Sequence, residues 1–187
     1  MSKDRIKEIA VQHFNRYGYE GVRMAQIAED AGIRKQSLSY HFSTKKALLE
    51  ELYEEVVEEE ISFVRSYFVS RSGLAWEEQL YQFLVEHKNR FVAHPNVHFM
   101  FVISFLTPTE VNDFVVVQYQ RYLAILREEV DLLFAQGQST RIPPEECTVA
   151  YMTLLDGLDV QLVYETLESY ERALKIGWNV LLHGTRL

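Results

Sequence analysis

The sequence predicts an all-α protein built from nine helices. Only four prolines and eight glycines punctuate its 187 residues, which is too few for the many turns of an all-β protein. Nearly half of the residues (48%) are apolar and 25% are charged, as is typical of a globular chain rather than a disordered one. Apolar residues recur at helical spacing through most of the sequence, and no segment is convincing as a strand.

Turn and capping residues set the expected helix ends. Gly18 and Gly32 follow the first two helices as C-terminal stops, and Ser43 and Thr109 are suitable N-caps for the fourth and seventh. The seventh helix is expected to stop near Gly137, and prolines separate several of the others. The nine expected helices cover residues 3–17, 24–31, 34–41, 43–68, 74–93, 97–106, 109–137, 143–165 and 167–183.

Charge divides the chain into a basic N-terminal part and an acidic remainder. Residues 1–49 hold nine Lys and Arg against five Asp and Glu, a net charge of +4, whereas residues 50–187 hold ten against 22, a net charge of −12. Salt screens charge attraction beyond about 8 Å at physiological ionic strength, so a basic head can bind DNA although the body is acidic. We therefore expect one domain over residues 1–49 and a second over residues 50–187.

Other classes of protein and site are disfavoured. The chain starts without an apolar signal segment and has no apolar stretch long enough to span a membrane, so a cytoplasmic protein is expected. The single cysteine, Cys147, excludes an internal disulfide and a cysteine-based zinc site within one chain. His94 and His98 are four residues apart, but Pro95 interrupts the helix between them and no third ligand is evident, so no metal is expected. Without a glycine-rich phosphate loop or a nucleophile–base pair, neither an enzyme nor a cofactor is expected.

Residues 18–49 have the plan of a helix-turn-helix, with two short helices joined by a turn at Gly32. The second of these helices carries a single apolar anchor, Leu38, which leaves it too polar to serve as core alone. Its other side chains are of the types that donate to phosphates and read base edges in a major groove. They are Arg34, Lys35, Gln36, Ser37, Ser39, Tyr40 and His41.

This segment resembles the DNA-binding domain of the TetR family. The family pattern includes I-A-x-x-A-G-V and then S-K-G-T-L-Y-x-(H/Y)-F-x-(S/T)-K-x-x-L, and the chain matches it over residues 27–33 and 35–49 without a gap. Residues 154–158, Leu-Leu-Asp-Gly-Leu, also resemble a segment of that family's penultimate helix. The resemblance implies a nine-helix TetR-like fold, in which a three-helix head binds DNA and a helical body binds an effector and dimerises.

The resemblance also assigns roles to head residues. Lys35, Gln36 and Ser37 are expected to face the groove, and Tyr40, His41 and Lys45 to contact phosphates. Tyr40 or His41 packing within the domain, and Lys45 as an ordinary solvated lysine, stay open as alternatives.

Four positions depart from the family pattern, and at one of them Ser39 replaces the usual tyrosine, which removes an expected phosphate partner. Arg23 and Arg34 stand where Ser or Thr usually caps a helix, which costs typically about 1 kcal/mol but offers a phosphate contact instead. Gln36 replaces a common glycine and is able to pair with adenine.

In the body, the resemblance implies a dimer interface made by the last two helices. An apolar stripe on the final helix permits this, and Gly157 lets a neighbouring helix approach closely; packing of the stripe inside the monomer is the alternative. The expected interface residues are Gly157, Leu167, Tyr170, Leu174, Trp178 and Leu181.

A small-molecule pocket is also implied, and the aromatic-rich middle helices suit one, although most of their aromatic residues must belong to the core. The residues expected to line it are Phe99, Tyr119, Tyr122, Tyr151 and Met152. Together these features predict a homodimeric repressor that an apolar or amphipathic ligand releases from operator DNA. A DNA-binding adaptor without a ligand, and an enzyme, are the alternatives.

Overall fold

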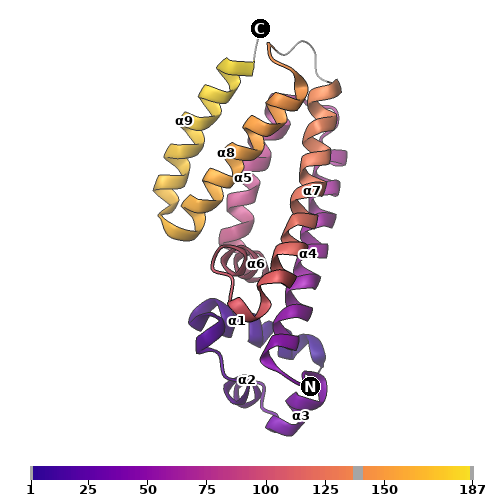
Figure 1. Cartoon of the computed structure of the whole chain (residues 1–187), viewed down its shortest axis with the longest axis vertical. Coiled ribbons are helices and arrows are strands. Elements are labelled where there is room, and N and C mark those ends of the chain that lie inside the picture. Colours follow the sequence, from indigo (N-terminus) through magenta and orange to yellow (C-terminus); the bar gives the residue numbers. More distant parts are fainter. Residues whose placement is uncertain (1, 137–140, 186–187) are drawn as a thin grey trace. The chain divides into compact units, whose positions relative to one another are not determined.

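The computed structural model describes residues 2–136 and 141–185, which form nine α-helices, one 3-10 turn and no strand (Figure 1). The all-α prediction is therefore confirmed for the described part of the chain. The elements are α1 (Lys3–Gly21), α2 (Met24–Asp30), α3 (Lys35–His41), α4 (Lys45–Ser70), α5 (Trp76–Ala93), α6 (Pro95–Phe105), η1 (Thr109–Val111), α7 (Asn112–Gln136), α8 (Pro144–Tyr164) and α9 (Leu167–Thr185).

By their packing, these elements form two compact units. The first comprises Met1–Glu59 and Val92–Gln120, and the second comprises Glu60–Phe91 and Arg121–Leu187. Helices α4, α5 and α7 each contribute residues to both units. The expected division of function at residues 49 and 50 stays a prediction.

In the first unit, α1 packs against α2 and α6 through an apolar face. Ile6, Ala10 and Phe14 are buried on this face. At Gly18 the helix kinks, because φ is 63°, a left-handed value that favours glycine. The kink turns Tyr19 into the core, where its ring stacks on Phe14 at 6.2 Å between ring centroids.

Helices α4 and α7 do not begin at the N-cap residues expected from the sequence. The side chain of Thr44, not that of Ser43, caps α4, because its Oγ1 accepts a hydrogen bond of 3.0 Å from the backbone N–H of Ala47, three residues on. Thr109 begins η1 instead of capping α7, which starts at Asn112. The expected stop at Gly137 lies outside the described residues.

In the second unit, α8 and α9 lie side by side and antiparallel (Figure 1). They approach closely at Gly177, where an added Cβ would stand 2.4 Å from Leu154 Cδ1. The hydroxyls of Tyr151 and Tyr170 donate to the carbonyl oxygens of Leu80 and Leu84 on α5, at 3.0 and 2.7 Å. These bonds satisfy both buried phenols and join α8 and α9 to α5.

Contacts between buried polar side chains also hold the second unit together. His87 Nε2 on α5 lies 2.5 Å from Asp159 Oδ1 on α8, and both side chains are buried. Arg90 pairs with the buried carboxylate of Glu60 through two nitrogen atoms and stacks over Phe63. The Glu60 carboxylate is buried, so loss of Arg90 would leave its charge without compensation.

Among the described helices, none by itself is long and apolar enough to cross a membrane. Two consecutive helical segments, residues 95–105 and 109–135, are long and apolar enough when taken together, and the chain bends sharply between them.

Candidate nucleic-acid interface

Helices α2 and α3 form the expected helix-turn-helix in the first unit. Ile27 and Ala28 bury one face of α2, and Leu38 is the one buried side chain of α3. The turn between the helices uses Gly32 at φ 66°, the second left-handed glycine. His13 Nε2 on α1 lies 2.7 Å from Asp30 Oδ2 and ties the end of α2 to the rest of the head.

The outer surface of α3 is polar and open. Lys35, Gln36, Ser37 and His41 are exposed, and Tyr40 is 87% exposed, which excludes its packing within the domain in this structure. Tyr40 instead makes an edge contact with the ring of His41, at 5.6 Å between centroids. The polar residues predicted from sequence therefore share one accessible surface.

The electrostatics of this surface favour an anionic partner. No Asp or Glu occurs from Arg34 to Lys46, a stretch that contains four Lys and Arg. Arg23 and Arg34 are the N-caps of α2 and α3, as expected, and neither side chain makes a capping hydrogen bond. Within residues 2–136 and 141–185, neither arginine nor Lys35 forms an ion pair, so their cationic groups are available to phosphates.

Lys45, at the start of α4, is held by the head itself. Its Nζ donates a 2.6 Å hydrogen bond to the carbonyl oxygen of Tyr19 and lies 4.1 Å from the centroid of the Tyr19 ring. The Tyr19 hydroxyl in turn donates to the Glu110 carboxylate at 2.7 Å. Burial raises the pKa of the Tyr19 phenol above its ordinary value, and the hydrogen bond to Glu110 raises it further. Lys45 is therefore not a freely solvated lysine, and its phosphate contact stays a prediction.

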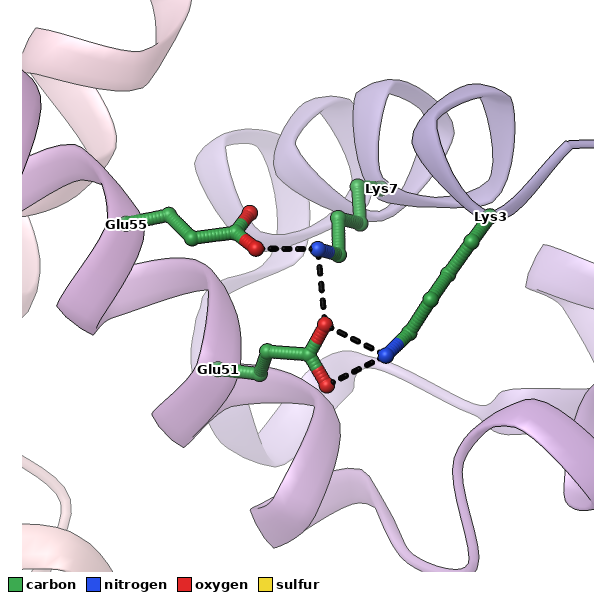
Figure 2. A network of polar contacts seen from close by, with 4 residues as sticks. All are labelled: Lys3, Lys7, Glu51 and Glu55. Atoms are coloured by element: carbon green, nitrogen blue, oxygen red, sulfur yellow. Dashed lines mark hydrogen bonds and ion pairs between the residues drawn. The ribbon is translucent and has the colours of Figure 1, made fainter.

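A second ionic network fixes α1 against α4 (Figure 2). Lys3 Nζ lies 2.6 Å from Glu51 Oε1, Lys7 Nζ lies 2.7 Å from the same atom, and Lys7 also contacts Glu55. Burial alone would raise the pKa of the Glu51 carboxyl, but hydrogen bonds from Lys3 and Lys7 outweigh it and hold that pKa below its ordinary value. The network restrains the helix that precedes the helix-turn-helix against the helix that follows it.

The acidic run of α4 is not uniformly a solvated face. Glu54, Glu58 and Glu59 are exposed, but Glu51 and Glu55 form ion pairs and Glu60 is buried. The sequence contained an indication of these ion pairs, because the two lysines at positions 3 and 7 and the two glutamates at positions 51 and 55 each have helical i,i+4 spacing. Only the fold brings the two pairs together.

The expected dimer residues divide into two groups. Tyr170, Leu174 and Trp178 are buried within the chain, so the structure places them in the core of the second unit instead of on a dimer surface. Gly157 and Leu167 are exposed and Leu181 is half-buried. The apolar stripe of α9 faces its own chain because α5 and α8 cover it, as the contact between Tyr81 and Trp178 at 5.6 Å illustrates.

A different apolar surface lies on the outer faces of α8 and α9. Along it, a shallow groove of about 460 Å³ is lined by residues that include Leu154, Gly177 and Val180. Of the large apolar side chains exposed on these two helices, only Leu167 was predicted from the sequence. The exposed side chains are Val149, Val160, Tyr164, Leu167, Ile176 and Val180.

The five expected pocket residues are divided between the two units. Phe99 and Tyr119 belong to the first unit, and Tyr122, Tyr151 and Met152 belong to the second. Phe99 is fully buried between the rings of Phe14 and Tyr53, so it is core. A hollow of about 710 Å³ in the second unit has other lining residues, at the end of α4, the start of α5 and the end of α7. No three His, Cys, Asp or Glu side chains are placed to hold a metal among the described residues.

Relatives match the N-terminal part of the chain. Residues 6–52 match the family of bacterial regulatory proteins, tetR family. IcaR of Staphylococcus aureus, the negative transcriptional regulator of the icaADBC biofilm operon, is 41% identical over 49 residues, 26% of this chain and 26% of that protein. The probable transcriptional regulator YttP of Bacillus subtilis is 32% identical over 85 residues, 46% of this chain and 41% of that protein. The chain thus spans about a quarter to two fifths of the length of these relatives.

Solved structures match the fold over the whole chain. FadR from Bacillus subtilis, a transcriptional regulator solved with stearoyl-CoA, superposes with a TM-score of 0.73 at 15% identity, covering 98% of this chain and 99% of that one. The TetR-family regulator PfmR from Thermus thermophilus superposes with a TM-score of 0.68 at 22% identity, covering 97% and 98%. With the helix-turn-helix match in the head, these findings show that residues 6–52 belong to the tetR family of bacterial regulatory proteins and that the whole chain has the fold of TetR-family regulators.

Proposed function

We propose that this chain is a sequence-specific DNA-binding repressor that a small ligand releases from its operator. The observation that carries DNA binding is α3, which is anchored by Leu38 and presents an open polar surface without a carboxylate. Such a helix suits the major groove, where phosphate contacts set the register and base-edge contacts give specificity. Repression is supported by the likeness of the head to IcaR, a negative regulator.

Lys35, Gln36 and Ser37 are the base-facing residues in this proposal, and Tyr40 and His41 contact phosphates. The exposure of all five side chains supports these roles. Arg23 and Arg34, which make no capping bond, add phosphate contacts at the N-termini of α2 and α3. Lys45 reaches a phosphate by exchanging the Tyr19 carbonyl oxygen for the DNA backbone.

The acting species in this proposal is a homodimer in the cytoplasm. One head reads few base pairs, and two heads related by a two-fold axis bind half-sites about one helical turn, ~34 Å, apart. The outer apolar face of α8 and α9, with Gly157 on it, is the surface that a second copy would cover. Family members of this kind are DNA-binding regulators, which speaks against the enzyme alternative.

The proposed switch acts through α4, which contributes residues 45–59 to the first unit and residues 60–70 to the second. A ligand in the second unit that favours a DNA-incompetent position of α4 would weaken operator binding. A 30- to 150-fold loss requires about 2–3 kcal/mol of differential affinity, and operator DNA must weaken ligand binding by the same factor. The FadR complex with stearoyl-CoA supports a ligand in a protein of this fold.

The test begins with selection of a DNA site from a randomised duplex library by the full chain. Enrichment of a two-fold symmetric site is expected, and a Gln36→Ala variant should enrich a site relaxed at one position. Failure to discriminate among sequences would contradict sequence-specific regulation. A bound ligand is then titrated with and without the selected DNA, and equal ligand affinity in both would leave an adaptor that does not sense a ligand.

A further inference from the structure

The hollow in the second unit has the make-up of a ligand site. Its volume of about 710 Å³ falls in the range of 300–1,000 Å³ that is usual for small-molecule pockets. Phe68 from α4, Trp76 from α5 and Leu133 from α7 contribute apolar wall. The ring of Trp76 is half-buried and packs against Phe134 at 5.1 Å between centroids, so it is held in place while one part stays accessible.

One buried polar group in the wall of this hollow lacks a partner. Gln79 is 2% exposed, and its Nε2 donates a 2.8 Å hydrogen bond to the carbonyl oxygen of Leu74. Because a carbonyl accepts only from the NH₂ end of the amide, this bond fixes which end carries Oε1. Oε1 is buried and accepts no hydrogen bond from any residue that the structure describes. An unsatisfied buried acceptor is unfavourable, so a donor that reached it would be bound strongly.

The charged residues that line the hollow are both acidic. They are Glu77 and Glu129, and none of the described lining residues is Lys, Arg or His. Burial, and next the neighbouring charge of Glu128, raises the pKa of the Glu129 carboxyl above its ordinary value, and this outweighs the opposite effect of Arg65. A cation placed beside Glu129 would therefore relieve an unfavourable environment, whereas an anion would worsen it.

We propose that this hollow binds an amphipathic primary ammonium ion, with the apolar tail against Phe68 and Leu133 and the ammonium near Glu129 and Gln79. Three features of the site match this class of ligand. The ammonium N–H groups supply the donors that Gln79 Oε1 lacks, the carboxylates supply the opposite charge, and the Trp76 ring supplies a face for a cation. The inference rests on the proposed function in taking this ligand as the effector.

The test uses three probes that share a ten-carbon chain and differ in the head group, each below its micellar concentration. Decylammonium has charge and donors, decyltrimethylammonium has charge without donors, and decanoate has the opposite charge. Binding is followed by the fluorescence of Trp76 in a Trp178→Phe background, since the chain has two tryptophans. We expect decylammonium to bind at least about ten-fold more tightly than decanoate, with decyltrimethylammonium between them.

Variants assign the selectivity to the hollow. Glu129→Gln should weaken decylammonium about three- to ten-fold, while Glu128→Gln, the same change at a neighbouring position on α7, should have a smaller effect. Gln79→Met should lower affinity for decylammonium but not for decyltrimethylammonium. Should this buried substitution prevent folding, the comparison of the two cations in the unaltered hollow tests the same contact.

Two outcomes would overturn the site: equal affinity for decanoate and decylammonium, or equal effects of Glu129→Gln and Glu128→Gln. The switch is judged separately, by measuring affinity for the selected DNA with saturating decylammonium. Binding without loss of DNA affinity would refute decylammonium-type ions as effectors and leave the site intact. If another ligand releases the DNA while the decyl probes do not bind, the ammonium site is wrong and the switch stands.

Discussion

Charge placed on the outer face of α8 and α9 should separate the proposed dimer without unfolding the chain. Val180 is 69% exposed and Ile176 is 55% exposed, so more than half of each side chain remains for a partner to cover. Full burial of such a side chain contributes about 1.5–3 kcal/mol, which leaves about 1–2 kcal/mol for each of these two. Each residue occurs twice in a two-fold interface, and the sum over the four side chains is about 4–8 kcal/mol.

The double variant Ile176→Asp with Val180→Asp removes this contribution and adds the cost of desolvating four carboxylates. Because buried area converts incompletely into affinity, we take the lower figure, about 4 kcal/mol, or an increase of roughly 10³ in the dissociation constant. Light scattering at micromolar concentration should change from twice the chain mass of 22.0 kDa to the single mass. Circular dichroism should show unchanged helix content, since both positions are exposed.

Two controls sharpen this test. Val92→Asp changes a 58% exposed valine in the first unit and should leave the dimer intact. Leu174→Asp, by contrast, places a charge in the core of the second unit and should unfold it. A double variant that stays dimeric with unaltered affinity, or an unaltered chain that is monomeric, would refute the assignment of this face.

Three further predictions concern the head. Lys45→Ala should weaken binding to all DNA sequences about equally and reduce the slope of log K against log salt by about 0.9, measured by fluorescence anisotropy. Leu38→Ala, which truncates the buried anchor of α3, should lower the free energy of unfolding by about 2–5 kcal/mol in urea titrations. Glu51→Gln should lower it by about 1 kcal/mol at neutral pH, a figure kept small because the ion pairs are partly exposed. The pKa of Glu51 is lower in the folded chain than in the unfolded chain. The stability that Glu51 contributes is therefore fully present when the pH is above the unfolded pKa, and it is lost as the pH falls through the folded pKa.

Each of these three predictions can be contradicted by a specific result. A Lys45→Ala variant with the unaltered salt slope would mean that Lys45 serves the contact with Tyr19 alone. A Leu38→Ala variant of unchanged stability would mean that α3 is anchored elsewhere. Glu54→Gln is the control for Glu51→Gln, because Glu54 is exposed on the same helix. An equal loss in both, or a loss at position 51 that grows as pH falls, would contradict the role of the network.

The local features of the head were predictable because they depend on neighbours in sequence. Gly18 and Gly32 take left-handed conformations that other residues adopt with strain, so each interrupts the helical path: Gly32 forms the turn after α2, whereas Gly18 kinks α1, which continues to Gly21 instead of stopping there as expected. Helix α3 needs one buried residue to be anchored, and its sequence offers Leu38 among polar side chains. Its outward surface follows from helical periodicity alone. The one-residue error at the cap of α4 reflects two adjacent hydroxyl residues, of which only Thr44 reaches the N–H of Ala47.

Contacts between distant segments were decided by the tertiary structure. The periodicity of α9 shows that one face is buried, but burial by the same chain and burial by a partner leave the same pattern. Packing against α5 and α8 encloses Tyr170, Leu174 and Trp178, and this leaves Ile176 and Val180 outside.

The sequence by itself therefore determined the helices, the polar surface of α3 and the resemblance of the head to the TetR family. The fold decided which charges and apolar faces meet, as when Glu51 and Glu55 come to lie against Lys3 and Lys7. It also decided that Gln79 Oε1 stays without a donor in the wall of a hollow. The physical reason is that helix formation is specified within a few turns, whereas burial and charge pairing depend on groups that the chain brings together from far apart.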